Sequence, residues 1–129
     1  MTAAFYPSFK KLALDGDIDL LADTIKIVAV DTADYTFNSA HDNLDDVAGA
    51  SRIGITGALT GKSTTAGVFD SDTGVIPSAS GDTFESVIIY KEGGTEATSP
   101  LIAFIDGISH SPDGNNINVN PNASGWFAL

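Results

Sequence analysis

The chain contains no cysteine, so disulfide bonds and thiolate metal ligands are excluded. It also lacks any apolar run approaching the roughly 20 residues that a membrane-spanning helix needs. Its opening, MTAAFYPSFKK, has no basic segment followed by an apolar stretch, so we expect no signal peptide. The sequence therefore predicts no membrane span and no membrane partner.

Basic residues are also few in this sequence. The sequence has six lysine and arginine residues against seventeen aspartates and glutamates, which gives a formal net charge of −11. Such a chain repels phosphate backbones, so we expect no nucleic-acid partner. The charge is typical of a highly soluble surface, and it equally suits a protein that meets a basic partner.

What the chain does contain is typical of one β-rich domain. Its 129 residues fit a single domain, and 43% hydrophobic with only 18% charged residues argues against disorder. Thirteen glycines and frequent Ser, Thr, Asp and Asn predict many turns between short strands. We therefore expect residues 1–129 to form a single β domain, with residues 1–10 as a candidate N-terminal arm.

The clearest strands are predicted at residues 84–91 and 101–106, on either side of a polar loop at residues 92–100. Both strands are rich in β-branched and aromatic residues. Their apolar residues are nearly continuous rather than alternating, which suits strands covered on both faces. The intervening loop is too long for a two-residue turn and suits an open hairpin connection.

A third strong strand is predicted at residues 24–31. Ile25, Ile27 and Ala29 would share one face, because side chains alternate along a strand, and the intervening residues would share the other. Shorter strands are expected at residues 52–56, 67–70, 75–76, 116–120 and 126–129. The apolar run at residues 126–129 predicts that this last segment is paired in a sheet rather than loose.

Helix content is predicted to be small. Asn, Asp and Ala after Ser39, with Leu44 and Val47 as the apolar side, indicate one short helix. Residues 5–14 fit either a strand or a short helix. Short strands separated by turns pair antiparallel. The predicted fold class is therefore all-β: a single antiparallel β-sandwich or jelly-roll-like barrel with at most one short helix.

Two segments resemble ligand-binding motifs but depart from them. Residues 57–63, GALTGKS, have three residues between their glycines where a phosphate-binding loop needs four. Residues 15–19, DGDID, open like a calcium loop, but Leu20 and Lys26 stand where that loop needs Gly and Glu. Between Asp15 and Asp23 a looser surface calcium site and a solvated acidic turn both stay open. We assign no cofactor and no metal ligand.

The two histidines, His41 and His110, stand far apart in the sequence. His41 is followed by Asp42, with Asp45 and Asp46 close behind, so a metal site or a general base could be built there. No second His or Cys stands at ligand spacing. An exposed histidine beside a carboxylate is the commoner arrangement, so we assign no catalytic residue and expect no enzyme.

Four aromatic residues leave two alternatives: Tyr90, Phe104, Trp126 and Phe127. They could line a groove for sugars or for a partner, or they could belong to the core or to subunit contacts. The surrounding residues are aliphatic and follow strand patterns, which favours the core or subunit contacts.

An ordered series of segments runs through the chain: FKKLALDGDID (9–19), LADTIKIVAV (21–30), YTFN (35–38), SRI (51–53), GALTGK (57–62), AGVFD (66–70), IIYK (88–91), ATSPLIAFID (97–106), GNNINV (114–119) and WFAL (126–129). In this order and spacing, over nearly the whole length, the chain resembles a widespread family of small structural proteins of tailed bacteriophages. Within that family it resembles the head decoration, or cement, proteins.

The resemblance implies a non-enzymatic virion component. A decoration protein binds the outer surface of the phage head and stabilises the contacts between capsomers. Its implied partners are the major capsid protein and itself, as a dimer or trimer. Its implied location is the outer surface of the virion head, and the host cytoplasm during assembly. Two alternatives are a tail or head–tail junction structural protein and a virion carbohydrate-binding module.

Two surfaces are left, by elimination, as candidates for contact with a partner. The first is the N-terminal arm with Phe5, Tyr6 and Phe9, because an aromatic arm with an early proline suits strand addition to a neighbour. For this arm, an edge strand of its own domain is the alternative. The second is the loop at residues 92–100, with the candidate contact residues Glu92, Gly93, Gly94, Thr95 and Pro100.

Overall fold

The central element is a five-stranded sheet with the strand order β1–β7–β6–β2–β3, in which every neighbouring pair is antiparallel. The computed structural model describes residues 2–129 and gives its strands as β1 (Thr2–Phe5), β2 (Ile25–Val30), β3 (Arg52–Ile55), β6 (Ser86–Lys91) and β7 (Leu101–Asp106). Met1, the first residue of the candidate arm, lies outside the described residues. The sheet separates two apolar clusters, which form the core on its two faces.

The predicted hairpin is confirmed at the centre of this sheet, where β6 and β7 lie side by side. The first five residues of each strand are buried, as the continuous apolar runs predict for strands covered on both faces. The alternation predicted for β2 is also confirmed. Ile25, Ile27 and Ala29 join one cluster, whereas Val28 and Val30 join the other.

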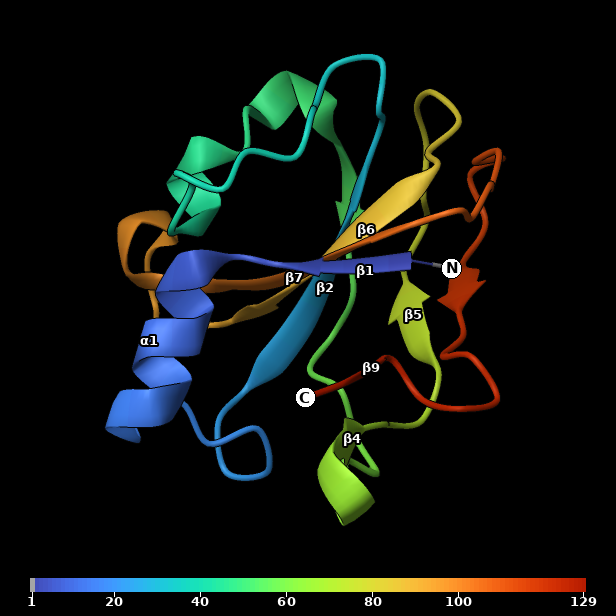
Figure 1. Ribbon diagram of the computed structural model, residues 1–129. Helices are drawn as coiled ribbons and strands as arrows, with labels where there is room; N and C mark the ends of the chain where they lie inside the picture. The colour runs from blue at the N-terminus through green and yellow to red at the C-terminus, as the bar shows by residue number, and fades with distance from the viewer. Residues whose placement is uncertain (1) are drawn as a thin grey trace.

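Different layers cover the two faces of the sheet (Figure 1). One face carries α1 (Pro7–Asp15) and two small ladders, β4 (Val68–Phe69) with β9 (Phe127–Ala128) and β5 (Gly74–Ile76) with β8 (Ile117–Val119). Residues 31–51 cover the other face, with the short 3-10 turns η1 (Leu44–Asp46) and η2 (Gly49–Ser51). Two further 3-10 turns are η3 (Thr65–Gly67) and η4 (Glu96–Thr98).

The helix lies in a different place from the one predicted. In the stretch after Ser39 the chain forms the two short 3-10 turns η1 and η2 instead of an α-helix, and the N-cap of η1 is Asn43. The α-helix is α1, which begins with Pro7 at its first position, where a missing N–H costs nothing. It ends at Gly16, whose left-handed backbone (φ 78°) lets its N–H and that of Asp17 bond back to the last turn. Residues 5–14, which fit a strand or a helix, are thus a strand end followed by a helix.

The all-β antiparallel class is confirmed, with nine strands and one short α-helix in residues 2–129. The prediction for residues 126–129 is confirmed too, because β9 pairs with β4. None of the helices in the described part of the chain combines the length and the apolar character that crossing a bilayer requires.

Candidate interaction surface

Residues 42–51 and 92–100 form one continuous surface, which we call the loop platform. Asn43 and Pro100 form an antiparallel bridge, and the Leu44 N–H donates to the Ser99 carbonyl at 2.9 Å. In Figure 1 the two segments lie together beside the N-terminal end of α1. The predicted hairpin loop is therefore not open, because Pro100 and Ser99 are paired with Asn43 and Leu44, which stand 57 and 55 positions earlier in the sequence.

Arg52, the chain's single arginine, holds the platform together. Its Nη1 and Nη2 donate to the two carboxylate oxygens of Glu96 at 2.8 and 3.0 Å. Its Nε donates to the Val47 carbonyl at 2.8 Å and its Nη2 to the Leu44 carbonyl at 2.7 Å. The guanidinium fork matches a carboxylate at two points, so this pairing fixes orientation as well as distance. The same contact lowers the pKa of Glu96 below its usual range.

The loop at residues 92–100 is also fixed from within. The Gly93 N–H donates to the Ser99 hydroxyl at 3.0 Å, and the Gly93 carbonyl accepts from the Thr98 hydroxyl at 3.0 Å. The hydroxyls of Thr95 and Thr98 lie 2.7 Å apart. A Cβ on Gly93 would stand 1.8 Å from the Thr98 carbonyl oxygen, so only glycine fits there. The loop is thus a pre-shaped surface rather than a flexible connection.

The candidate contact residues of this loop are accessible. Gly93, Gly94 and Thr95 are exposed, and Glu92 and Pro100 are partly exposed at its two ends. Glu92 also faces Lys26 across 3.6 Å.

The candidate arm requires a correction. Residues 2–5 are not free but form β1, the outer strand of the sheet, paired with β7. Tyr6 is 0% and Phe9 1% exposed, so neither ring is available to a partner. Burying such large aromatic surfaces stabilises the fold more than leaving them in water on a loose arm. Only Phe5, which is partly buried, borders the surface, and the edge-strand alternative describes this segment.

A chain of hydrogen bonds joins the core to the surface next to the platform. The Tyr6 and Tyr35 hydroxyls lie 2.8 Å apart, and the Tyr35 hydroxyl lies 3.0 Å from His41 Nδ1. Burial, reinforced by the bond to Tyr35, raises the pKa of the Tyr6 hydroxyl. Burial also raises the pKa of the Tyr35 hydroxyl, so both tyrosines stay neutral, and the contact with Tyr35 anchors the His41 ring.

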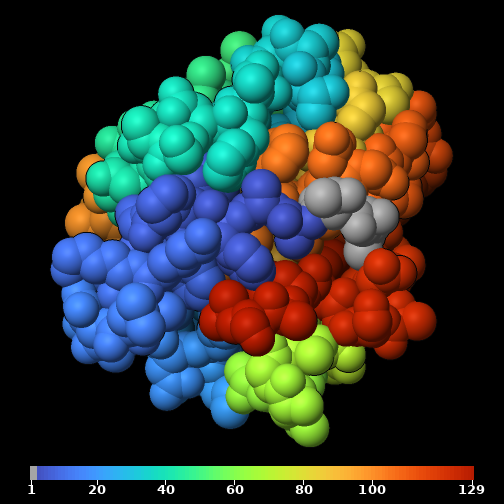
Figure 2. Space-filling view, in the orientation of Figure 1, coloured from blue at the N-terminus to red at the C-terminus, as the bar shows by residue number. Residues whose placement is uncertain are grey.

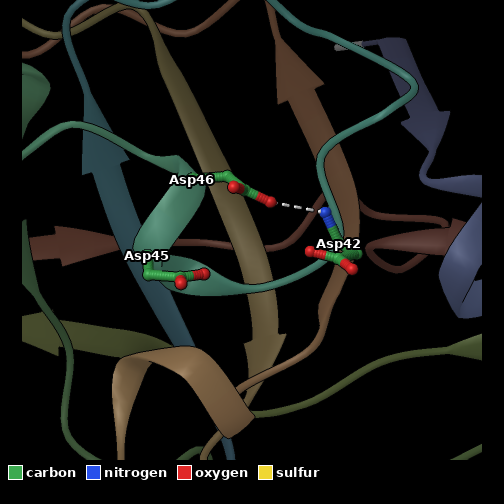
Figure 3. A group of neighbouring side chains, drawn as sticks. All are labelled: Asp42, Asp45 and Asp46. Atoms are coloured by element: carbon green, nitrogen blue, oxygen red, sulfur yellow. Dashed lines mark hydrogen bonds between the residues drawn. The ribbon is translucent and has the colours of Figure 1, made fainter.

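Three carboxylates gather on the exposed side of the platform: Asp42, Asp45 and Asp46 (Figure 3). Their oxygens lie within 4.8 Å of one another. The Asp46 side chain accepts the Asp42 N–H at 2.9 Å and caps η1, and this bond lowers the pKa of Asp46. The capping accounts for the position of Asp46.

The carboxylates between Asp15 and Asp23 do not form such a group. Asp15 pairs with Lys11, and Asp23 pairs with Lys91 at 3.2 Å. Within residues 2–129 the only group of three acidic side chains close enough to share an ion is the one on the platform.

The four aromatic residues considered for a ligand groove are buried. Tyr90 is 1%, Phe104 8%, Trp126 4% and Phe127 5% exposed. The Trp126 Nε1 donates to the Ser71 hydroxyl at 2.8 Å, which satisfies the polar end of its ring inside the protein. All four belong to the two core clusters, as the core alternative predicts.

A second exposed feature is apolar and lies at the end of α1. Leu14 is 89% and Leu129 69% exposed, and with Phe9, Lys10 and Ala13 they line a depression of about 290 Å³. Isolated exposed leucines are common on soluble proteins.

Comparisons with known proteins add no relative: no protein-family model matches the chain, and no curated protein matches it.

Sequence reasoning located the loop at residues 92–100 but missed Arg52 and Tyr35. One sequence signal could have identified Arg52: it is the single arginine, beside five lysines. Arginine is the residue suited to two-point pairing with a carboxylate. For Tyr35 the sequence carries no such signal, because its partners are 29 positions before it and 6 after it.

Proposed function

We propose that the protein is a non-enzymatic decoration protein of a phage head, which binds the outer surface of the shell through the loop platform and strengthens contacts between capsomers. The observation that carries the proposal is an exposed acidic surface whose loop is held by internal hydrogen bonds and by the Arg52–Glu96 pair. A binding surface that is already ordered loses little conformational freedom on binding.

The charge of the platform supports a basic partner. Asp42, Asp45 and Asp46 have no salt-bridge partner within residues 2–129. Their segment lies against residues 99–100, since Asn43 pairs with Pro100 and Leu44 with Ser99. A net charge of −11 also suits a protein on the outside of a shell, since such a protein has no genome to neutralise. Many weakly bound copies would stabilise the shell together through avidity.

The test uses phage capsids that lack the protein. Purified protein should co-sediment with these capsids and raise their resistance to heat or to chelator. Protein that stays in the supernatant while the capsids sediment would contradict the proposal. In an electron micrograph of the virion, a decoration protein is expected across the head in many copies. A single ring of density at the neck or along the tail would favour the junction or tail alternative.

A matched pair of charge reversals tests the role of the platform. Asp45→Lys changes an exposed platform residue whose side chain makes no hydrogen bond within residues 2–129. Asp82→Lys makes the same charge change at the opposite end of the β6–β7 hairpin. We expect the first substitution to weaken co-sedimentation and the second to leave it unchanged. Equal effects would remove the platform from the contact.

A further inference from the structure

The outer edge of β1 is an unpaired strand edge. β1 pairs with β7 on one side and ends the sheet on the other. The Tyr6 N–H donates to the Ile102 carbonyl at 3.2 Å, so the N–H of Ala4, two residues earlier, also faces β7. The N–H and C=O groups of Ala3 and Phe5 therefore point away from the sheet. Figure 2 shows β1 at the surface, between the segment that covers one face of the sheet and the C-terminal segment.

A pocket of about 270 Å³ opens beside this edge. Ala3 and Ile105, which are paired in register, form its wall on the sheet, and Trp126, Phe127 and neighbouring residues form the opposite wall. The small side chain of Ala3 leaves the pocket open. The Phe5 and Phe127 rings, 5.1 Å apart in an edge-to-face contact, lie next to it along the strand.

An unpaired edge beside a pocket lined mainly by apolar residues, with Asn122 and Ser124 at its wall, has the two parts that strand addition needs. Backbone groups on the edge bind an extended peptide in any sequence, and a pocket selects one side chain. We propose that the edge of β1 docks an extended segment of a partner protein, with one apolar side chain in the pocket and lysine or arginine on both sides of it.

Charge argues for a basic occupant. Within residues 2–129 the side chains of Lys11, Lys26, Lys91 and Arg52 each pair with a carboxylate, and Lys62 donates to the Asp23 carbonyl. Few positive groups are left to offset the net charge of −11.

Acidic residues also lie near both ends of the edge. Asp106 lies opposite Thr2 in the register, at one end of β1. At the other end, the carbonyl of Asp42 accepts the N–H of Leu101, the first residue of β7. A second copy of the chain would bring another eleven net negative charges to this edge, so we favour a different protein as the occupant.

This docking site deepens the proposed function, on which it rests for the identity of the partner: the extended segment would belong to the shell protein. Its test uses no capsids, so its failure and that of the decoration role are separate results. Capsids that bind the protein while a basic strand peptide does not would leave decoration standing and remove this edge.

The probe is the acetylated and amidated peptide Lys-Lys-Thr-Val-Thr-Val-Thr-Lys-Lys, added to the isotope-labelled protein. At saturation, we expect amide hydrogen exchange of Ala3 and Phe5 to slow by about tenfold or more, because their N–H groups become paired. The exchange of Ala4, whose N–H already faces β7, should change less. A peptide with glutamate in place of every lysine should bind about tenfold more weakly or not at all.

Two variants separate the edge from the pocket. Ala3→Pro removes an outward N–H that the fold does not use, as prolines on edge strands do, and it should weaken binding by about tenfold. Ala3→Ser keeps that N–H and is the matched control. Ser124→Phe adds a large side chain at an exposed residue of the pocket wall, and it should weaken binding without touching the edge.

Three results would overturn the proposal. The first is no slowing of exchange at Ala3 and Phe5 at millimolar peptide. The second is equal binding of the lysine and glutamate peptides, which removes the basic occupant. The third is protection of the same two amides that grows with protein concentration in the absence of peptide, which would make a second copy the occupant. Thermal melts of each variant establish that it is folded, and Ser124→Phe still tests the site if Ala3→Pro does not fold.

Discussion

The Arg52 guanidinium holds the Glu96 carboxylate by two hydrogen bonds of 2.8 and 3.0 Å, across 44 positions of sequence. The same guanidinium also donates to the carbonyls of Leu44 and Val47. One side chain thus ties η4 to the segment around η1. Four hydrogen bonds within the platform come from this one side chain.

Arg52→Ala should therefore destabilise the protein by about 2 kcal/mol, because two carbonyls lose a charged donor. Glu96→Gln should cost less than about 1 kcal/mol, since Glu96 is exposed and the carbonyl bonds survive. Urea denaturation of both variants checks the difference. Equal losses would mean that the ion pair, and not the carbonyl contacts, provides the stabilisation.

The buried tyrosine pair predicts an asymmetry. Tyr6→Phe leaves the Tyr35 hydroxyl with its contact to His41, so it should cost about 1 kcal/mol. Tyr35→Phe leaves the Tyr6 hydroxyl buried without a partner, so it should cost about 2 kcal/mol. Urea denaturation of the two single variants and the double variant gives the coupling directly. If Tyr6→Phe is the more destabilising change, the unpaired Tyr6 hydroxyl is not what determines the cost of Tyr35→Phe, and the expectation is wrong.

The strands could be predicted from the sequence because the pattern of apolar residues within each strand indicates which of its side chains are buried. The alternation in β2 and the continuous apolar runs of β6 and β7 each depend on residues close together in the chain. The position of the helix could not be read in the same way. Whether Phe9 and its neighbours extend β1 or form α1 depends on the core cluster into which the Phe9 ring packs.

Only one part of the loop platform, the loop at residues 92–100, could be predicted from local sequence. Glycines and polar residues mark residues 92–100 as an exposed loop. The pairing of Ser99 with Leu44, and of Glu96 with Arg52, joins residues that only the folded sheet brings together. The prediction that Tyr6 and Phe9 contact a partner was wrong, because the sequence does not distinguish aromatic residues in an exposed arm from aromatic residues in the core.

Asp46 predicts a pH dependence. Its pKa in the folded protein lies below the usual value, chiefly because its carboxylate accepts the Asp42 N–H. A depressed folded pKa adds stability above the unfolded pKa of about 3.9, and this is lost as the pH falls through the folded value. Because Asp46 is exposed, the loss in Asp46→Asn at pH 7 should be only about 0.5 kcal/mol.

Thermal melts of wild type and Asp46→Asn between pH 7 and pH 2.5 check this expectation. The difference between the two proteins should shrink as the pH falls below about 3.9. Asp45→Asn is the matched control, since the Asp45 side chain accepts no hydrogen bond within residues 2–129, and it should show little difference at any pH. A difference for Asp46→Asn that stays constant down to pH 2.5 would assign the effect to shape rather than to charge.

Gly93 predicts a link between loop shape and partner binding. In Gly93→Ala the new Cβ would stand 1.8 Å from the Thr98 carbonyl oxygen, so the loop at residues 92–100 must change its path. Gly49→Ala is the matched control, because a Cβ there meets nothing within 4 Å and Gly49 also belongs to the platform.

We expect Gly93→Ala to lower stability by about 2 kcal/mol and to weaken capsid co-sedimentation, whereas Gly49→Ala should change both little. Because the central strands stay buried, the fold itself should survive, with an unchanged far-ultraviolet circular dichroism spectrum. The decisive comparison is binding measured well below the melting temperature of each variant. Normal binding by a folded Gly93→Ala protein would mean that the shape of residues 92–100 is not what the shell recognises. The contact would then have to lie elsewhere, and the edge of β1 is the next surface to test.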